Sequence, residues 1–193
     1  MESKRKATIL VVDDDELVLD ALREQLTWDD YDVVTSPSAN EALEQLAARP
    51  FDVIISDQRM PGMLGTELLA EATRIQPSAS RILITGVLSI DTVIEAINRG
   101  EIFRFLAKPW LRAELLATVS NAVHRHDLIV SNNALQARTA QLNDELEKTN
   151  ATLRTKLCRR TSTTRSNSAT ASSTHSTRCS ASTRKAWSKF AGA

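Results

Sequence analysis

Four groups of polar residues, each directly after a short apolar run, could do chemistry together. They are the three aspartates at 13–15, then Asp57, Thr85 and Lys108. Crowded carboxylates repel each other, and this repulsion raises the pKa of at least one of them. A hard divalent cation relieves the repulsion. Mg²⁺ suits a small acidic cup with oxygen ligands, because it keeps some of its waters and accepts an oxygen from a phosphate.

The lysine and the hydroxyl predict a phosphoryl group at the same place. A phosphoryl group on Asp57 would present one oxygen to Mg²⁺, a second to Lys108 and a third to the Thr85 hydroxyl or a backbone N–H. Such a site stabilises phosphoryl transfer by position and charge. Asp57 is then the nucleophile that forms an acyl phosphate.

Each of these residues also has an ordinary interpretation. Acids at 13–15 are typical of the first turn of a helix, and we interpret Asp15 in this way. An isolated Asp57 before a Pro-Gly pair is typical of a turn. Lys108 alone could be solvated, and Thr85 alone could be a plain strand residue. Their joint occurrence at the ends of successive apolar runs favours the phosphoryl site.

Five short runs, mostly rich in Val, Ile or Phe, predict the strands that position these residues. They span residues 8–12, 32–36, 51–56, 81–85 and 102–107. Apolar residues at helical spacing separate them, as at Leu17, Leu22 and Leu26. The alternation predicts an α/β fold with a doubly wound, five-stranded parallel sheet covered on both faces. In such a sheet a ligand lies outside the carboxyl ends of the strands.

Two local signals predict helix ends. Ser38, followed three residues later by Glu41, is typical of a capping box before a helix that begins at residue 39. The apolar residues at 93, 94 and 97 predict a helix that ends at Asn98-Arg99-Gly100.

The motifs "ILVVDDD", "VIISDQRMPGMLGTELL", "ILITG" and "FLAKPW" closely resemble the receiver domain of two-component response regulators, over residues 7–125 and in matching order. The resemblance implies a flavodoxin-like sheet with strand order 2-1-3-4-5. It also implies that Asp57 accepts a phosphoryl group from a sensor histidine kinase or a phosphotransfer protein. Mg²⁺ is then held by Asp14 and Asp57, by Asp13 through water, and by the backbone carbonyl of Arg59.

The same resemblance makes Thr85 and Lys108 the phosphate partners and Phe105 the switch aromatic. Thr85 would shift toward the phosphate, and Phe105 would turn inward into the space that Thr85 leaves. Such a small charge event biases a surface between two states.

Residues 126–157 contain no Gly or Pro and predict that the last receiver helix continues as a helical linker. One leucine recurs in each heptad, at d for the first three and at a for the last two: Leu128, Leu135, Leu142, Leu146 and Leu153. Asn132 and Thr139 make the early a positions polar. A parallel coiled coil in a homodimer is the sharper hypothesis, and packing of one helix on an output domain is the alternative.

The sequence says less about the output domain, which would respond to phosphorylation of the receiver. The stretch "NRGEIFRFLAKPW" and the linker "LQARTAQLNDELEKTN" resemble regulators with an HD-GYP-type phosphohydrolase output, which implies a truncated cyclic-di-GMP phosphodiesterase as an alternative. This chain contains no His-Asp metal cluster, so we expect no output catalysis from it. His124 and His126 lack acids at metal-ligand spacing, and we expect both to be solvated. A DNA-binding regulator is a third hypothesis, although nothing resembles a helix-turn-helix.

Charge and cysteines set the segment 158–193 apart. It holds seven Lys or Arg and no acid, which leaves 17 basic against 24 acidic groups in the first 157 residues, unlike a nucleic-acid binder. Both cysteines, Cys158 and Cys179, lie in it, so the body has neither a disulfide framework nor a cysteine zinc site. No run is long enough to span a membrane and the start lacks a signal peptide, so we expect a cytoplasmic protein.

The same segment contains no Leu, Ile or Val, and Ser or Thr make up 16 of its 36 residues, so it cannot bury a core and should be disordered. One interpretation is a basic arm that binds nucleic acid or membrane, since Trp187 and Phe190 lie among lysines. The other is a shifted reading frame. Moving the frame back by one base turns serine codons into apolar ones at helical spacing, and we favour a frameshifted helical output domain.

Overall fold

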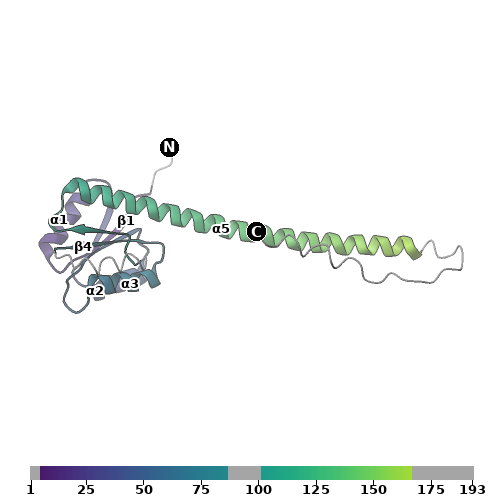
Figure 1. Ribbon diagram of the computed structural model, residues 1–193, viewed down its shortest axis with the longest axis horizontal. Helices are drawn as coiled ribbons and strands as arrows, with labels where there is room; N and C mark the ends of the chain where they lie inside the picture. Colours follow the sequence, from purple (N-terminus) through teal and green to yellow (C-terminus); the bar gives the residue numbers. More distant parts are fainter. Residues whose placement is uncertain (1–4, 87–100, 167–193) are drawn as a thin grey trace, which may run out of the picture. The chain divides into compact units, whose positions relative to one another are not determined.

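A five-stranded parallel sheet forms the centre of the chain, with strand order β2-β1-β3-β4-β5 (Figure 1). The computed structural model describes residues 5–86 and 101–166, with side chains to residue 156. The strands are β1 (Thr8–Val12), β2 (Asp32–Ser36), β3 (Val53–Asp57), β4 (Ser80–Thr85) and β5 (Arg104–Ala107). This order confirms the predicted doubly wound, flavodoxin-like fold.

Four described helices cover the sheet: α1 (Glu16–Thr27), α2 (Ala39–Ala48), α3 (Gly65–Ile75) and α5 (Arg112–Ser166). Figure 1 shows α2 and α3 on one face and α1 with the beginning of α5 on the other. The helix predicted around residues 93–97, with its end at Asn98-Arg99-Gly100, lies outside the described residues.

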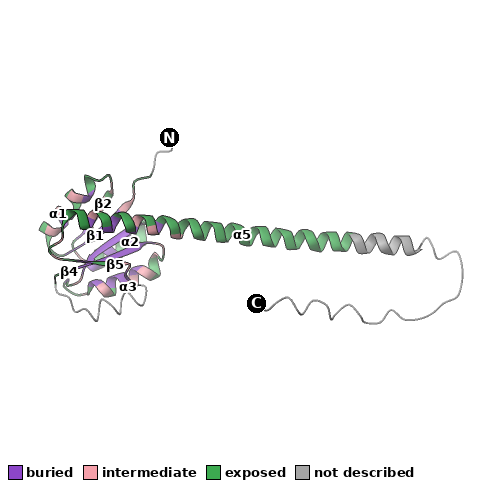
Figure 2. Ribbon diagram, turned by 45° about the horizontal axis from the view of Figure 1, so that its top comes forward, coloured by how far each residue is buried: buried purple, intermediate pink, exposed green. Residues whose placement is uncertain are grey.

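The alternation of side chains along β1 explains why both faces are covered. Leu10 and Val12 belong to a buried cluster with residues of α2 and α3, whereas Ile9 and Val11 belong to a second cluster with residues of α1 and α5. Successive side chains of a strand point to opposite faces, so an apolar run without polar interruptions needs a layer on each side. Figure 2 shows the resulting buried strands at the centre of the domain.

Local capping fixes where two helices begin. Asp15 is the N-cap of α1, and its side chain accepts a hydrogen bond from the Leu17 backbone N–H at 2.9 Å. Ser38 is the N-cap of α2 and accepts from the Glu41 N–H at 3.3 Å. Both caps satisfy backbone donors that the first helical turn leaves without a partner. The predicted helix starts at these two positions are confirmed.

Two strands begin later than predicted. β3 starts at Val53 and not at residue 51, and it includes Asp57 as its last residue. The N–H of Phe51 donates to the side chain of Gln76 at 2.8 Å, so Phe51 lies before the ladder. β5 starts at Arg104 and not at residue 102.

The long helix predicted after Lys108 is present as α5. Buried side chains along its described part end at His126, close to the predicted receiver end at residue 125. The backbone stays helical to Ser166, so the start of the segment 158–193 is helical where composition predicts disorder. That stretch lacks the Gly or Pro that would end a helix, and residues 167–193 lie outside the described part.

The chain divides into two units, Met1–Arg138 and Thr139–Ala193. Within the described residues, no helix combines the length and apolar character needed to cross a membrane.

Candidate functional site

The carboxyl ends of β1, β3, β4 and β5 surround a small pocket of about 190 Å³. Because the strands are parallel, their last residues meet at one edge: Val12 lies level with Ser56, and Thr85 with Ala107. The residues that line the pocket follow directly from these ends. They are Asp13, Asp14, Asp15, Asp57, Gln58, Arg59, Thr85, Gly86 and Lys108.

The ammonium group of Lys108 joins the two buried carboxylates of the pocket. Lys108 Nζ lies 2.7 Å from Asp13 Oδ2 and 2.6 Å from Asp57 Oδ1. Burial acts to lower the pKa of Lys108, but hydrogen bonds to Asp13 and Asp57 and their negative charge outweigh it and raise this pKa above its ordinary value. Lys108 is therefore a firmly held cation between two anions.

Asp13 is under electrostatic strain in this arrangement. Burial raises the pKa of Asp13, and the charge of Asp57 adds to the rise. The hydrogen bond from Lys108 and the bond from the Asp15 N–H, at 3.0 Å, act in the opposite direction but do not cancel it. An ionised Asp13 is thus unfavourable in the metal-free protein, which is common for groups at functional sites.

Backbone contacts hold Asp57 in place. Its second oxygen, Oδ2, accepts a hydrogen bond from the Arg59 N–H at 2.5 Å. The next residue, Gln58, donates its N–H to the Ile84 carbonyl at 3.0 Å, which ties the end of β3 to β4. The side-chain oxygen of Gln58 accepts from the Thr66 N–H at 3.2 Å and so binds the first turn of α3 to the site.

Gly65 allows α3 to start against Asp57. A Cβ at position 65 would lie 2.0 Å from the Asp57 carbonyl oxygen and 2.9 Å from its carbonyl carbon. No side chain fits at that distance, so only glycine permits this close approach of two backbones. The Gly65 N–H also donates to the Gln58 carbonyl at 3.0 Å.

The remaining predicted site residues differ in how close they lie to the pocket. Thr85 is buried and lines the pocket, and its carbonyl accepts from the Lys108 N–H at 2.9 Å. Asp14 also lines the pocket, with an exposed side chain. Phe105 does not line it: this residue of β5 is 40% exposed and lies level with Leu83 of β4.

The chemistry of the donors fits Mg²⁺, since the described residues of the pocket offer carboxylate and backbone carbonyl oxygens and no soft ligand. Within the described residues, however, no three acidic, His or Cys side chains are grouped so that they could hold a metal ion. Lys108 engages Asp13 and Asp57, and the Asp14 side chain is exposed. The metal role of Asp13, Asp14, Asp57 and the Arg59 carbonyl therefore stays a prediction.

One side chain was misjudged from sequence. His126 is 8% exposed and contacts Asp52, so the expectation that it is solvated is wrong, whereas His124 is exposed as expected. The signal was present in the spacing, because Leu115, Val119, Ala122 and His126 recur on one face of a helix. A polar residue at the end of such a face needs a buried partner.

Comparison with known proteins agrees with this fold and pocket. The family model described as "Response regulator receiver domain" matches residues 9–120. This match covers more than half of the chain, and the chain belongs to the response regulator receiver family.

Two relatives illustrate the similarity. The hydrogenase transcriptional regulatory protein HoxA of Cupriavidus necator is 36% identical over 154 residues, covering 80% of this chain and 30% of HoxA. The DNA-binding transcriptional regulator NtrC of Klebsiella pneumoniae is 32% identical, covering 69% of this chain and 27% of NtrC. The chain thus spans less than a third of the length of either relative.

A solved structure shows the same domain. It is the signal receiver domain of an HD domain-containing protein from Pseudomonas fluorescens Pf-5, with 38% identity and a TM-score of 0.61. The match covers 66% of this chain and 94% of that one.

The strain at Asp13 predicts that Asp13→Asn stabilises the metal-free protein. The amide removes a buried charge whose pKa is raised, so in EDTA at neutral pH the free energy of unfolding should rise by about 1 kcal/mol. The folded protein holds the Asp13 proton more tightly than the unfolded chain does. The gain should therefore shrink as the pH falls toward the ordinary carboxyl pKa. Urea unfolding at several pH values measures both effects.

The matched control is Asp14→Asn, which removes the exposed neighbouring carboxylate from the same pocket. It should change stability in EDTA by less than about 0.5 kcal/mol. A destabilised Asp13→Asn protein, or equal effects of the two substitutions, would contradict the proposed strain.

Proposed function

We propose that this receiver accepts a phosphoryl group on Asp57 from a histidine kinase or a phosphotransfer protein. One observation supports this function above the others: a buried carboxylate at a strand end has one oxygen on a lysine ammonium and the other on a backbone N–H. This arrangement aims Asp57 into the pocket and surrounds it with donors suited to anionic phosphoryl oxygens.

In the transfer, a carboxylate oxygen of Asp57 attacks the phosphorus of a phosphohistidine. The P–N bond breaks as the P–O bond forms, and the imidazole that leaves takes up a proton. Lys108 is placed to neutralise the phosphoryl group, because its ammonium already contacts Asp57 Oδ1. Asp13, Asp14, Asp57 and the Arg59 carbonyl would hold Mg²⁺, which supplies positive charge next to the transferring oxygens.

The switch follows from the change in charge. A phosphoryl group on Asp57 offers Lys108 and the Thr85 hydroxyl new acceptors, and Thr85 moves toward it. Phe105 then turns inward. Its present 40% exposure supports this step, since the ring has not yet taken up a buried position.

Asp57→Asn should abolish phosphoryl incorporation, because an amide oxygen is not a nucleophile of this kind. The measurement incubates the full chain with acetyl phosphate and Mg²⁺ and follows the mass of the intact protein. Asp15→Asn is the control. Asp15 lines the same pocket but caps α1, and asparagine caps a helix equally well. An Asp57→Asn protein that gains phosphate like the wild type would refute the assignment.

The relatives' names support a transcriptional output for a longer parent protein. HoxA and NtrC are named as transcriptional regulators, and the HoxA match extends over 154 residues, which is beyond the receiver and into the linker. The receiver of the HD domain-containing protein supports the second candidate, an HD-type phosphohydrolase output. In either case we assign to this chain phosphoryl acceptance and no output catalysis.

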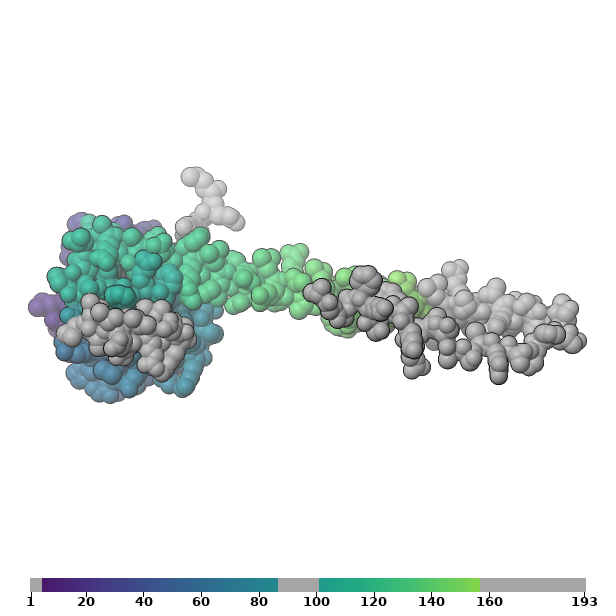
Figure 3. Space-filling model, in the orientation of Figure 1, coloured from purple at the N-terminus to yellow at the C-terminus, as the bar shows by residue number. Residues whose placement is uncertain are grey.

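The exposed leucines of α5 support a homodimer. Leu128, Leu135, Leu142, Leu146 and Leu153 are each more than half exposed, and they keep the a/d spacing of a heptad. Figures 2 and 3 show the solvent-facing surface of the helix in this region. A second copy in parallel would place each leucine against its own counterpart. It would also pair Asn132 with Asn132, a contact that fixes register.

Leu135→Lys should weaken this dimer, because it brings two charges together in the seam. The dimer dissociation constant should rise by at least about tenfold in sedimentation equilibrium. Ala137→Lys is the control, since residue 137 is exposed and takes the f position, away from the partner helix. A chain that is monomeric before substitution, or an equal effect of both changes, would contradict the dimer.

A further inference from the structure

His126 is the last buried side chain along the described part of α5. The next large apolar residue, Leu128, is 57% exposed and begins the leucine series. His126 thus lies where α5 leaves the core of the domain. It is at the amino-terminal edge of the sheet, opposite the Asp57 pocket, because its contacts reach the segments just before β3 and β4.

Both ring nitrogens of His126 have acceptor partners. Nδ1 lies 2.9 Å from the backbone carbonyl oxygen of Ser78, and Nε2 lies 3.0 Å from Asp52 Oδ1. A carbonyl oxygen can only accept, so Nδ1 must carry a proton. Asp52 also accepts from the Thr8 N–H at 2.7 Å and from the Arg5 guanidinium, as expected of an ionised carboxylate. Only a doubly protonated ring, an imidazolium, can donate to both of these acceptors.

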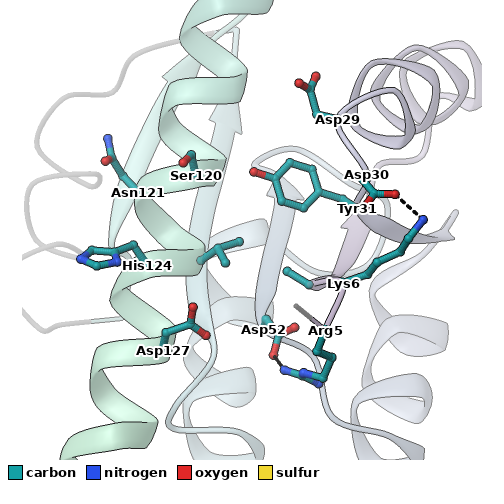
Figure 4. Close-up of a pocket in the computed structure, with 12 residues that line it drawn as sticks. Arg5, Lys6, Asp29, Asp30, Tyr31, Asp52, Ser120, Asn121, His124 and Asp127 are labelled. Atoms are coloured by element: carbon teal, nitrogen blue, oxygen red, sulfur yellow. Dashed lines mark hydrogen bonds and ion pairs between the residues drawn. The ribbon is translucent and has the colours of Figure 1, made fainter. Parts of the chain in front are cut away.

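The surrounding charges agree with this assignment. Asp52 is 4% exposed and is the acid that contacts His126, and Figure 4 shows it together with Arg5. His124, on the same helix, points away from them in that view. The nearby cations have partners of their own: Arg81 donates to the Glu101 and Ala79 carbonyls, and Arg125 to Ser80 Oγ. The other charged groups around this edge, among the described residues, are Lys6, Asp29, Asp30, Arg49 and Asp127.

We propose that His126 is a protonation-dependent latch that fixes the exit of α5 to the amino-terminal edge of the sheet. The neutral ring has a single N–H and cannot donate to both Ser78 and Asp52. Loss of one proton therefore leaves either the Ser78 carbonyl or the Asp52 carboxylate facing a nitrogen without a proton. One of the two contacts that hold α5 just before the leucine series is then lost. The latch does not depend on phosphoryl transfer, since it uses no residue of the Asp57 pocket.

The ring protonation can be read directly. In nitrogen-15 NMR spectra of the full wild-type chain at neutral pH, both ring nitrogens of His126 should carry protons, with the signal assigned through its loss in His126→Gln. A neutral ring with one protonated nitrogen at neutral pH would overturn the proposal. This NMR measurement requires only that the wild-type protein is folded.

Stability gives the second test. At neutral pH the unfolding constant of His126→Gln should be about tenfold higher than that of the wild type, the scale of one hydrogen bond to a charged group.

His124→Gln, two residues away and exposed, is the matched control and should follow the wild type. Equal unfolding constants for the wild type and His126→Gln would contradict the latch. If His126→Gln does not fold, the signal is assigned instead by eliminating His124 with His124→Gln and His175 with His175→Gln, and the wild-type ring spectrum decides alone.

Discussion

The contact of one ammonium group with two buried carboxylates sets the conditions for the rest of this molecule. Lys108 follows β5 and Asp13 follows β1, whereas Asp57 is the last residue of β3, and 95 positions separate Lys108 from Asp13 in the chain. Only a parallel sheet in the observed order brings these ends together. The fold must hold two like charges in a buried place, and the lysine compensates them only in part. Such a site favours the binding of further positive charge, or a change in the groups that Lys108 contacts.

Different contacts form at the two ends of the parallel strands, the carboxyl edge and the amino edge of the sheet. At the carboxyl edge, contacts converge on Asp57: Arg59 holds one oxygen, and Gly65 lets the start of α3 approach its carbonyl. At the amino edge, Asp52 gathers the starts of β1 and β4 through Thr8 and Ser80, and it binds His126 of the last helix. Pockets border both edges, and at both of them the buried carboxylates have partners within the protein.

Much of this could be predicted from the sequence, because the signals were local or repeated. The Val- and Ile-rich runs predicted the strands, and the acid at Asp15 and the capping pattern at Ser38 predicted two helix starts. The site residues followed from the rule that parallel strands end at one edge. What failed depended on contacts between distant segments. The helical spacing does place His126 on the buried face, but it does not reveal its partner Asp52, nor the contact of Gln76 with Phe51 before β3. Composition also misplaced the end of α5, since a polar stretch without Gly or Pro can remain helical.

The most direct test of the central claim asks which side chain carries the phosphoryl group. The wild-type chain is treated with acetyl phosphate and Mg²⁺, reduced with borohydride, digested and mapped by mass spectrometry. Borohydride converts an aspartyl phosphate to homoserine, so the label marks the acceptor. We expect homoserine at position 57 alone, in the peptide that contains the end of β3. Homoserine at position 13 or 14, or its absence under conditions that phosphorylate another receiver, would contradict the account.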